Sequence, residues 1–274
     1  MLTAKDMSEV LLVTDMDGTL ITAPDPVCQR NLEAIDRFIA AGGHFAIATG
    51  RAIATARRFA DQIQQSAPSI LVNGGLLYDY RTEKKVWECT LPDEARDVLV
   101  NVKKQFPKVG IEVVIDHDVY NFGHNEYTYR RVATEHMKYK YGSVYDIPGG
   151  WQKVLFATPE KDQAELIEYV GQNDYNGVYF IPTSKVFLEL IPKEASKGNA
   201  LRALGESLGI RHENICAIGD YYNDISMLDY AGLSATPSGA PDDVKSHSDL
   251  TVCSAKEGAV GEFIDYIFSQ VVKG

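Results

Sequence analysis

The feature that most constrains this chain is a short apolar run that stops at two carboxylates. The run Val10-Leu11-Leu12-Val13 precedes the segment Asp15-Met16-Asp17-Gly18-Thr19-Leu20. Large aliphatic residues that give way to charge are typical of a buried parallel strand that ends at the polar edge of its sheet. Gly18 allows the backbone to turn sharply after the strand. The alternative is an ordinary exit from strand to loop, where Asp and Gly are common turn residues.

Composition places the chain among ordinary globular proteins and limits its partners. Its 274 residues suffice for one large domain or two smaller ones, and 45% are apolar and 24% charged. No apolar run approaches the roughly 20 residues that span a bilayer, and the first ten residues contain no signal-peptide core. The four cysteines are widely spaced, which is typical of buried thiols in a reducing compartment. We therefore predict a cytoplasmic protein with no membrane partner.

The net charge of −11 argues against a nucleic-acid partner, which would require a basic surface. It does not exclude a small anionic substrate, because exposed charges are screened beyond about 10 Å. No sequence feature selects an oligomeric state.

Strands and helices alternate through the first 75 residues. Helical spacing of apolar residues follows the first strand and stops at Gly42-Gly43. A second strand is predicted at 45–48, a helix at 52–65 and a third strand at 70–72. This alternation indicates βαβ units, so we predict an α/β fold built on a doubly wound, Rossmann-like parallel sheet.

The alternation breaks at about residue 81 and resumes at Ser196. Between these points we predict an inserted α+β domain over 82–187, and a core domain formed by 1–81 and 188–274. Within the insertion, helices are predicted at 93–106, 127–139 and 161–171, and strands at 85–88, 111–115, 153–157 and 177–181. Five tyrosines lie between residues 127 and 145, and ordinary packing of sheet and helix accounts for most of them. A further strand is predicted at 187–191.

The second half of the core repeats the pattern of strand and helix. Ser196 is a good N-cap for a helix that ends at Gly209. A strand at 215–218 then leads into the segment Gly219-Asp220-Tyr221-Tyr222-Asn223-Asp224. A helix, two short strands near 233–235 and 250–252 and a final helix from about residue 257 complete the prediction.

Four of the predicted core strands end in short polar segments. These segments are Asp15 with Asp17, Thr49-Gly50, Asn73-Gly74 and Gly219-Asp220. If the strands are parallel, the segments meet at one edge of the sheet, where open α/β sheets bind ligands. Carboxylate oxygens with room for water suit Mg²⁺ better than Ca²⁺, and the absence of histidine from these four turns argues against zinc.

Lys197, in the first turn of a predicted helix, adds a positive charge to this set. A helix N-terminus with a lysine is a good site for an anion, although a solvated surface lysine is the alternative. Carboxylates, Mg²⁺, a hydroxyl and a lysine together describe a site for phosphoryl transfer. One Asp can attack phosphorus while a second acid protonates the leaving oxygen and later activates water, and Asp15 and Asp17 fit these roles.

The order of these segments resembles that of the haloacid dehalogenase superfamily of phosphatases. The resemblance is to the Cof-like group, subclass IIB, whose cap domain is inserted between the second and third motifs, and it covers nearly the whole chain. The matching residues are Asp15-Met16-Asp17-Gly18-Thr19, Thr49-Gly50-Arg51, Lys197 and Gly219-Asp220-Tyr221-Tyr222-Asn223-Asp224. The chain departs from the family in the turn at 235–240, which leaves the matching residues untouched.

The resemblance implies a role for each of these residues. It makes Asp15 the nucleophile and Asp17 the general acid and base. It implies a Mg²⁺ ion held by the Asp15 side chain, the Asp17 carbonyl and Asp220, with Asp224 in support. It implies a phosphoryl group held at Thr49, Gly50, Lys197 and Asn223, with Asn73 and Arg51 nearby.

The expected function is hydrolysis of a small phosphorylated metabolite, such as a sugar phosphate or a nucleotide-like phosphate. Two alternatives remain at this point. A phosphomutase on the same scaffold would return the phosphoryl group to the substrate instead of to water. A non-catalytic binding module would keep the fold. Such proteins usually lose one of the charged residues of the site, whereas this chain retains Asp15, Asp17, Lys197 and Asp220.

Overall fold

The computed structural model describes residues 2–22, 26–135, 139–173 and 175–271, and it separates into two compact units. The first unit comprises residues 1–51, 56–87 and 196–274, and the second comprises 52–55 and 88–195. The main segment of the second unit thus interrupts the first in the sequence. This segment is shifted toward the C-terminus relative to the predicted 82–187.

An eight-stranded sheet forms the centre of the first unit, in the order β14-β13-β12-β1-β2-β3-β4-β5. The strands are β1 (Leu11–Asp15), β2 (His44–Ala48), β3 (Ser69–Leu71), β4 (Leu76–Asp79), β5 (Lys84–Glu88), β12 (Ile215–Ile218), β13 (Leu233–Pro237) and β14 (Leu250–Val252). Pairing is parallel from β14 through to β3, whereas β4 runs antiparallel to β3. The predicted α/β sheet is therefore confirmed, with an antiparallel addition at one end.

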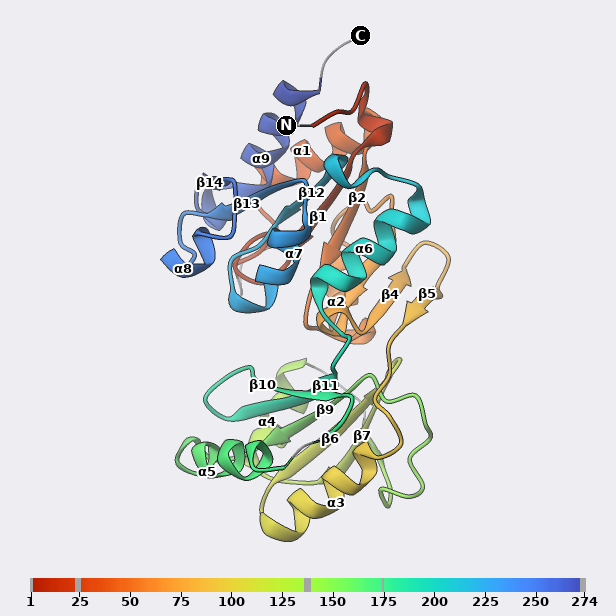
Figure 1. Ribbon diagram of the computed structural model, residues 1–274, viewed down its shortest axis with the longest axis vertical. Helices are drawn as coiled ribbons and strands as arrows, with labels where there is room; N and C mark the ends of the chain where they lie inside the picture. The colour runs from red at the N-terminus through yellow and green to blue at the C-terminus, as the bar shows by residue number, and fades with distance from the viewer. Residues whose placement is uncertain (1, 23–25, 136–138, 174, 272–274) are drawn as a thin grey trace. The chain divides into compact units, whose positions relative to one another are not determined.

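Helices cover both faces of this sheet (Figure 1). They are α1 (Gln29–Ala40), α2 (Ile53–Ala60), α6 (Lys197–Leu208), α7 (Ile225–Tyr230), α8 (Asp242–Lys245) and α9 (Ala259–Gln270). On β1, Leu12 packs into the cluster beneath α1 and α9, whereas Leu11 and Val13 pack into the cluster beneath α6. Because both faces of β1 are buried, every position of the strand is apolar until its polar end.

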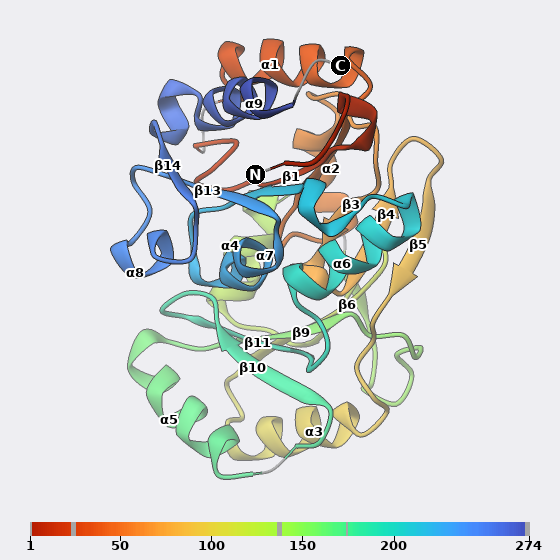
Figure 2. The same ribbon diagram turned by 45° about the horizontal axis from the view of Figure 1, so that its top comes forward.

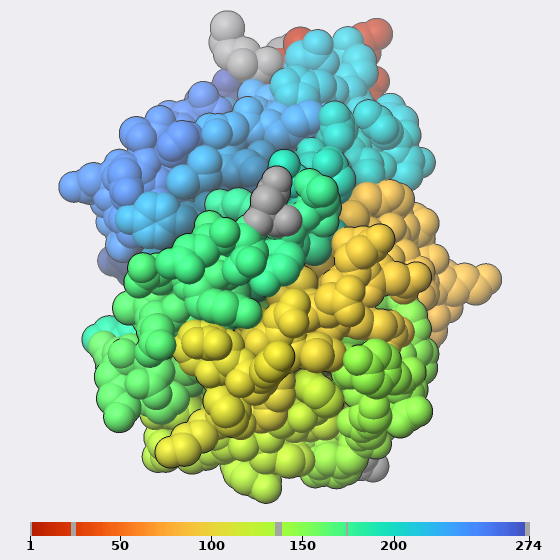
Figure 3. All heavy atoms as spheres, turned by 60° about the horizontal axis from the view of Figure 1, so that its bottom comes forward, coloured from red at the N-terminus to blue at the C-terminus, as the bar shows by residue number. Residues whose placement is uncertain are grey.

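β5 marks the edge of the same sheet. Most of its residues are exposed, and Val86 keeps 48% of its surface accessible. The surface of this edge is visible in orange in Figure 3. The strand had been expected in the inserted domain, but its place beside β4 puts it in the core sheet.

The second unit is a six-stranded sheet in the order β10-β11-β9-β6-β7-β8. Its elements are α3 (Ala95–Gln105), β6 (Gly110–Ile115), β7 (Asp118–Gly123), α4 (Glu126–Glu135), β8 (Tyr139–Tyr141), β9 (Lys153–Ala157), α5 (Glu160–Gly171), β10 (Val178–Pro182) and β11 (Phe187–Pro192). All pairs are antiparallel except β7 with β8. The predicted α+β class of the insertion is confirmed.

Helices α3 and α5 lie along one face of this second sheet and enclose its apolar core (Figure 2). Helix α4 contacts the opposite face, where Arg131 pairs with the buried Glu112 of β6. The helix predicted over 127–139 was too long, because α4 ends at Glu135 and Tyr139 belongs to β8. The intervening residues, 136–138, lie outside the described part of the chain. The strand β11 pairs with β9 and β10, so it belongs to the inserted unit.

In the described part of the chain, every helix is too short or too polar to cross a lipid bilayer.

Candidate active site

The site is built around Asp15, the last residue of β1, and Lys197, the first residue of α6. Asp15 is 5% exposed, and Lys197 is completely buried. Their side chains meet, with Lys197 Nζ 2.6 Å from Asp15 Oδ1. Ser196 caps the helix as predicted, since its Oγ accepts a hydrogen bond from the backbone N–H of Asn199 at 3.1 Å. This cap fixes the start of α6 and thereby the backbone from which Lys197 projects.

Asp224 holds the other side of the lysine and closes the loop that follows β12. Its Oδ1 lies 2.5 Å from Lys197 Nζ. Its Oδ2 accepts the backbone N–H groups of Asp220 and Tyr221, each at 3.0 Å. Asp224 therefore ties the loop at 220–221 to the lysine, and it is itself fully buried.

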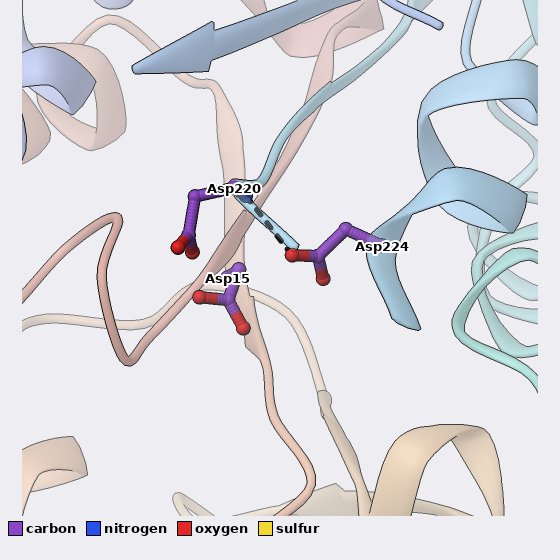
Figure 4. Close-up of side chains that lie close together, drawn as sticks. All are labelled: Asp15, Asp220 and Asp224. Atoms are coloured by element: carbon purple, nitrogen blue, oxygen red, sulfur yellow. Dashed lines mark hydrogen bonds between the residues drawn. The ribbon is translucent and has the colours of Figure 1, made fainter. Parts of the chain in front are cut away.

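Asp220 completes a group of three carboxylates that point toward one another (Figure 4). Its Oδ1 accepts a hydrogen bond from Thr19 Oγ1 at 2.9 Å, which links the loops after β12 and β1 across 201 residues. Gly18, between these loops, has φ +97°, and a Cβ atom there would overlap Oδ2 of Asp220. Glycine is therefore required at position 18 both for its backbone conformation and for the close approach of Asp220.

The three carboxylates face a single ammonium group, so the site carries an excess of negative charge. Burial raises the pKa of Asp15 well above its usual range, and the neighbouring Asp224 raises it further. Burial also raises the pKa of Asp220. Burial alone would lower the pKa of Lys197, but the carboxylates of Asp15 and Asp224 outweigh it, so this pKa is raised and the lysine stays charged.

The arrangement suits a divalent cation with oxygen ligands. One oxygen from each of Asp15, Asp220 and Asp224 lies within 4.8 Å of the others. Oδ2 of Asp15 is buried and accepts no hydrogen bond from the described part of the protein. A buried, unpaired carboxylate oxygen is costly unless a positive group approaches it. A cation bound here would satisfy that oxygen and reduce the repulsion among the three acids.

Asp17 lies apart from this buried group. Its carboxylate is 43% exposed and forms a two-pronged ion pair with Arg51, with Nε–Oδ2 at 2.8 Å and Nη2–Oδ1 at 2.7 Å. The guanidinium carbon of Arg51 also lies 4.9 Å from the centroid of the Phe59 ring. Arg51 was expected only to be near the site, and the structure gives it a defined partner.

A second polar group lies at the ends of β2 and β3 and in the loop after β12. Thr49 is buried, and its Oγ1 accepts the backbone N–H of Arg51 at 3.2 Å. Asn223 Nδ2 donates to Asn73 Oδ1 at 3.0 Å, and a Cβ atom at Gly50 would lie 2.9 Å from that same oxygen. The hydroxyl hydrogen of Thr49 and the second N–H of Asn223 are thus suited to donate to an anion.

The structure places all ten candidate residues at the carboxyl ends of β1, β2, β3 and β12 or at the start of α6. It joins Asp15, Asp220, Asp224 and Lys197 through ion pairs or close approach. The pairs Asp17–Arg51 and Asn73–Asn223 had no specific sequence signal, because each joins segments that are remote in the chain. The bond from Thr19 to Asp220 was likewise missed, although Thr19 stands in the first motif.

The chain matches the family model of the haloacid dehalogenase-like hydrolases over residues 12–264. It is 26% identical over 267 residues to the pyridoxal phosphate phosphatase YbhA of Escherichia coli, covering 94% of this chain and 98% of that protein. It is also 26% identical over 284 residues to the 5-amino-6-(5-phospho-D-ribitylamino)uracil phosphatase YwtE of Bacillus subtilis, again covering 94% and 98%.

Among solved structures, the subclass IIB sugar phosphatase BT4131 has a similar fold, with a TM-score of 0.79 and 20% sequence identity. The match covers 94% of this chain and 99% of that structure. The resemblance drawn from the motifs is confirmed, as is the prediction of an enzyme that hydrolyses phosphoric monoesters. The chain belongs to the haloacid dehalogenase-like hydrolase family.

Proposed function

We propose that this protein is a Mg²⁺-dependent phosphatase of small phosphorylated metabolites that forms an aspartyl-phosphate on Asp15. The observation that carries the proposal is the pairing of Asp15 and Asp224 with the buried ammonium of Lys197, with the carboxylate of Asp220 beside these two acids. This combination suits a phosphoryl group, because positive charge must offset the phosphate before a carboxylate can approach it.

In the first step, a carboxylate oxygen of Asp15 attacks phosphorus, and the bond from phosphorus to the leaving oxygen breaks. Asp17 donates a proton to that leaving oxygen. In the second step, Asp17 takes a proton from water, the water oxygen attacks phosphorus, and the bond between Asp15 and phosphorus breaks. The ion pair with Arg51 occupies both oxygens of Asp17, so Arg51 must release it for either step.

The bound Mg²⁺ would supply positive charge to the phosphoryl oxygens, and Asp15, Asp220 and the Asp17 carbonyl would hold it. Lys197 would add positive charge near the same oxygens, while Asp224 keeps the lysine and the loop at 220–221 in place. Thr49, the Gly50 backbone and Asn223 would donate hydrogen bonds to the phosphoryl group.

For the substrate we propose a phosphate monoester of a small metabolite, either a sugar phosphate or a nucleotide-like phosphate. Relatives that cover nearly the whole chain are named for pyridoxal phosphate and for a phosphorylated ribitylaminouracil, and both are small organic phosphates. We assign the choice of substrate to the inserted domain.

The test is release of phosphate from p-nitrophenyl phosphate, with Mg²⁺ and with EDTA, followed by a panel of phosphorylated metabolites. We expect turnover only with Mg²⁺. Asp15→Asn should abolish hydrolysis without unfolding the protein, and Asp17→Asn should slow it by about 10²–10⁴-fold. Asp36→Asn makes the same change on the exposed side of α1 and should leave the rate unchanged.

Substantial turnover by Asp15→Asn would show that Asp15 is not the nucleophile. A rate near that of the wild type for Asp17→Asn would remove Asp17 from proton transfer. Isomerised product in the presence of a bisphosphate activator would favour a phosphomutase, and phosphate binding without turnover would favour a non-catalytic module.

A further inference from the structure

The segment that leaves β3 has an unusual backbone. Val72, Asn73 and Gly74 have φ values of +54°, +55° and +95°. Asparagine tolerates this left-handed region better than most residues, but a β-branched residue such as valine rarely enters it. Val72 and, to a smaller extent, Asn73 therefore store strain, whereas Gly74 adopts this region freely. Strain of this kind persists only where the surrounding structure enforces it.

Two backbone hydrogen bonds enforce it here. Val72 N–H donates to the carbonyl of Arg51 at 3.0 Å, and Asn73 N–H donates to the carbonyl of Thr49 at 3.0 Å. At Gly74 a Cβ atom would overlap the backbone carbonyl of Ser196. The strained segment is thus held between the backbone after β2 and the residue that caps α6.

This backbone conformation fixes the position of the Asn73 side chain. Asn73 is 7% exposed, and its Oδ1 accepts a hydrogen bond from Asn223 Nδ2 at 3.0 Å, across 150 residues. An amide nitrogen carries two N–H groups, so this bond uses one and fixes the direction of the other. Without Asn73, the amide of Asn223 could rotate about its last bond and turn its oxygen toward an anion.

We infer that Asn73 is a positioning residue that orients the Asn223 amide so that an N–H, and not the carbonyl oxygen, faces the phosphoryl group. The inference rests on the proposed function for the identity of that anion. It explains why the chain keeps asparagine in a strained turn where glycine would fit the backbone better: glycine has no side chain to accept the bond from Asn223.

Three variants at position 73 distinguish the effect of the asparagine side chain from the effect of the strained backbone. Asn73→Gly removes the amide and relieves the backbone, Asn73→Ala removes the amide and keeps the strain, and Asn73→Asp keeps an acceptor for Asn223. We expect Gly and Ala to raise KM for p-nitrophenyl phosphate about tenfold, the effect of one misdirected hydrogen bond to a charged group, with kcat changed less than about threefold. Asn73→Asp should recover part of the loss in KM.

The melting temperatures of these variants should depend on the backbone strain at position 73 and should not parallel their KM values. The melting temperature of Asn73→Gly should exceed that of Asn73→Ala, although both show the same rise in KM. A rise in KM that followed the loss of stability instead would make the role of Asn73 structural and overturn the inference.

The partner is tested with Asn223→Ala. In this background Asn73→Gly should add less than about twofold to KM, because its effect passes through the Asn223 amide. Independent, multiplicative effects of the two substitutions would contradict this coupling, as would a KM for Asn73→Gly within about twofold of the wild type.

Binding of orthovanadate in the presence of Mg²⁺, measured by calorimetry, separates failure of this inference from failure of the proposed function. If the wild type lacks phosphatase activity, the proposed function fails. The inference then stands if Asn73→Gly weakens vanadate binding about tenfold, and it falls if the affinity is unchanged.

Discussion

Replacing Lys197 with methionine tests the electrostatic centre of the site most directly. Methionine fills a similar volume but leaves the carboxylates of Asp15 and Asp224, at 2.6 and 2.5 Å from the lost ammonium, without their shared partner. Removing one partner of a buried ion pair costs about 3–5 kcal/mol, because the remaining charge stays buried. In the presence of EDTA we expect the free energy of unfolding to fall by an amount in this range. We also expect the phosphatase activity to be lost completely.

Urea unfolding measures this loss of stability. The fluorescence of the two tryptophans shows which of the two units is destabilised. Trp87 lies in the first unit and Trp151 in the second, so a Trp151→Phe background reports on the unit that contains Lys197. With an m-value of about 2 kcal/mol per M, the expected loss shifts the midpoint of that transition by about 1.5–2.5 M. In a Trp87→Phe background the remaining tryptophan reports on the second unit, where we expect a smaller shift.

The stability loss of Lys197→Met should depend on pH and on Mg²⁺, because it arises from the unpaired carboxylates of Asp15 and Asp224. Burial and Asp224 raise the pKa of Asp15 in the wild type, and removal of the ammonium raises it further. An acid whose folded pKa is raised destabilises the protein progressively as the pH rises from its unfolded pKa, about 4, toward the folded pKa, so the loss should shrink as the pH falls from 8 to 5. Mg²⁺ should stabilise the variant more than the wild type, because the cation replaces part of the missing charge.

Adding Asp224→Asn to Lys197→Met removes one of the two unpaired charges and should recover part of the stability. A loss below about 1 kcal/mol for Lys197→Met, or a double variant whose loss equals the sum of the single losses, would refute this account of the site.

Three further substitutions test the backbone and the electrostatics outside this centre. Gly18→Ala should reduce activity at least about tenfold by displacing Asp220, whereas Gly209→Ala, also at positive φ but facing open space, should lose about 1–2 kcal/mol of stability with unchanged activity. Equal activities of the two variants would contradict the argument. The hydrogen bond from Arg81 lowers the pKa of Asp79, so Asp79 stabilises the fold above about pH 4 and loses this effect at lower pH. Asp79→Asn should therefore lower the melting temperature at pH 7, and this difference from the wild type should shrink as the pH falls below about 4.

The sequence predicted the elements whose pattern is local. The aliphatic run before Asp15 corresponds to β1, and the strand expected at 153–157 is β9 as observed. Ser196 caps α6, and Gly209 ends it in the left-handed conformation. These predictions succeeded because burial on two faces and hydrogen bonding at helix ends act over a few neighbouring residues.

Predictions that depended on pairing partners were less accurate. β5 joins the core sheet and β11 joins the inserted one, although the predicted boundaries at 82 and 187 assigned them otherwise. The strand β7 was not predicted at all, and the helix over 127–139 was drawn too long. A strand's sequence shows that it is extended, but the edge that it joins is decided by contacts with distant segments.

The same division applies to the site. The sequence by itself determined that carboxylates, a hydroxyl and an amide stand at the ends of core strands, because each motif is continuous in the chain. Only the tertiary structure decided that Lys197 is completely buried between Asp15 and Asp224, that Arg51 holds Asp17, and that a strained turn brings Asn73 to Asn223. These contacts join residues between 27 and 182 positions apart, and their geometry is set by how the sheet and helices pack, which no local pattern encodes.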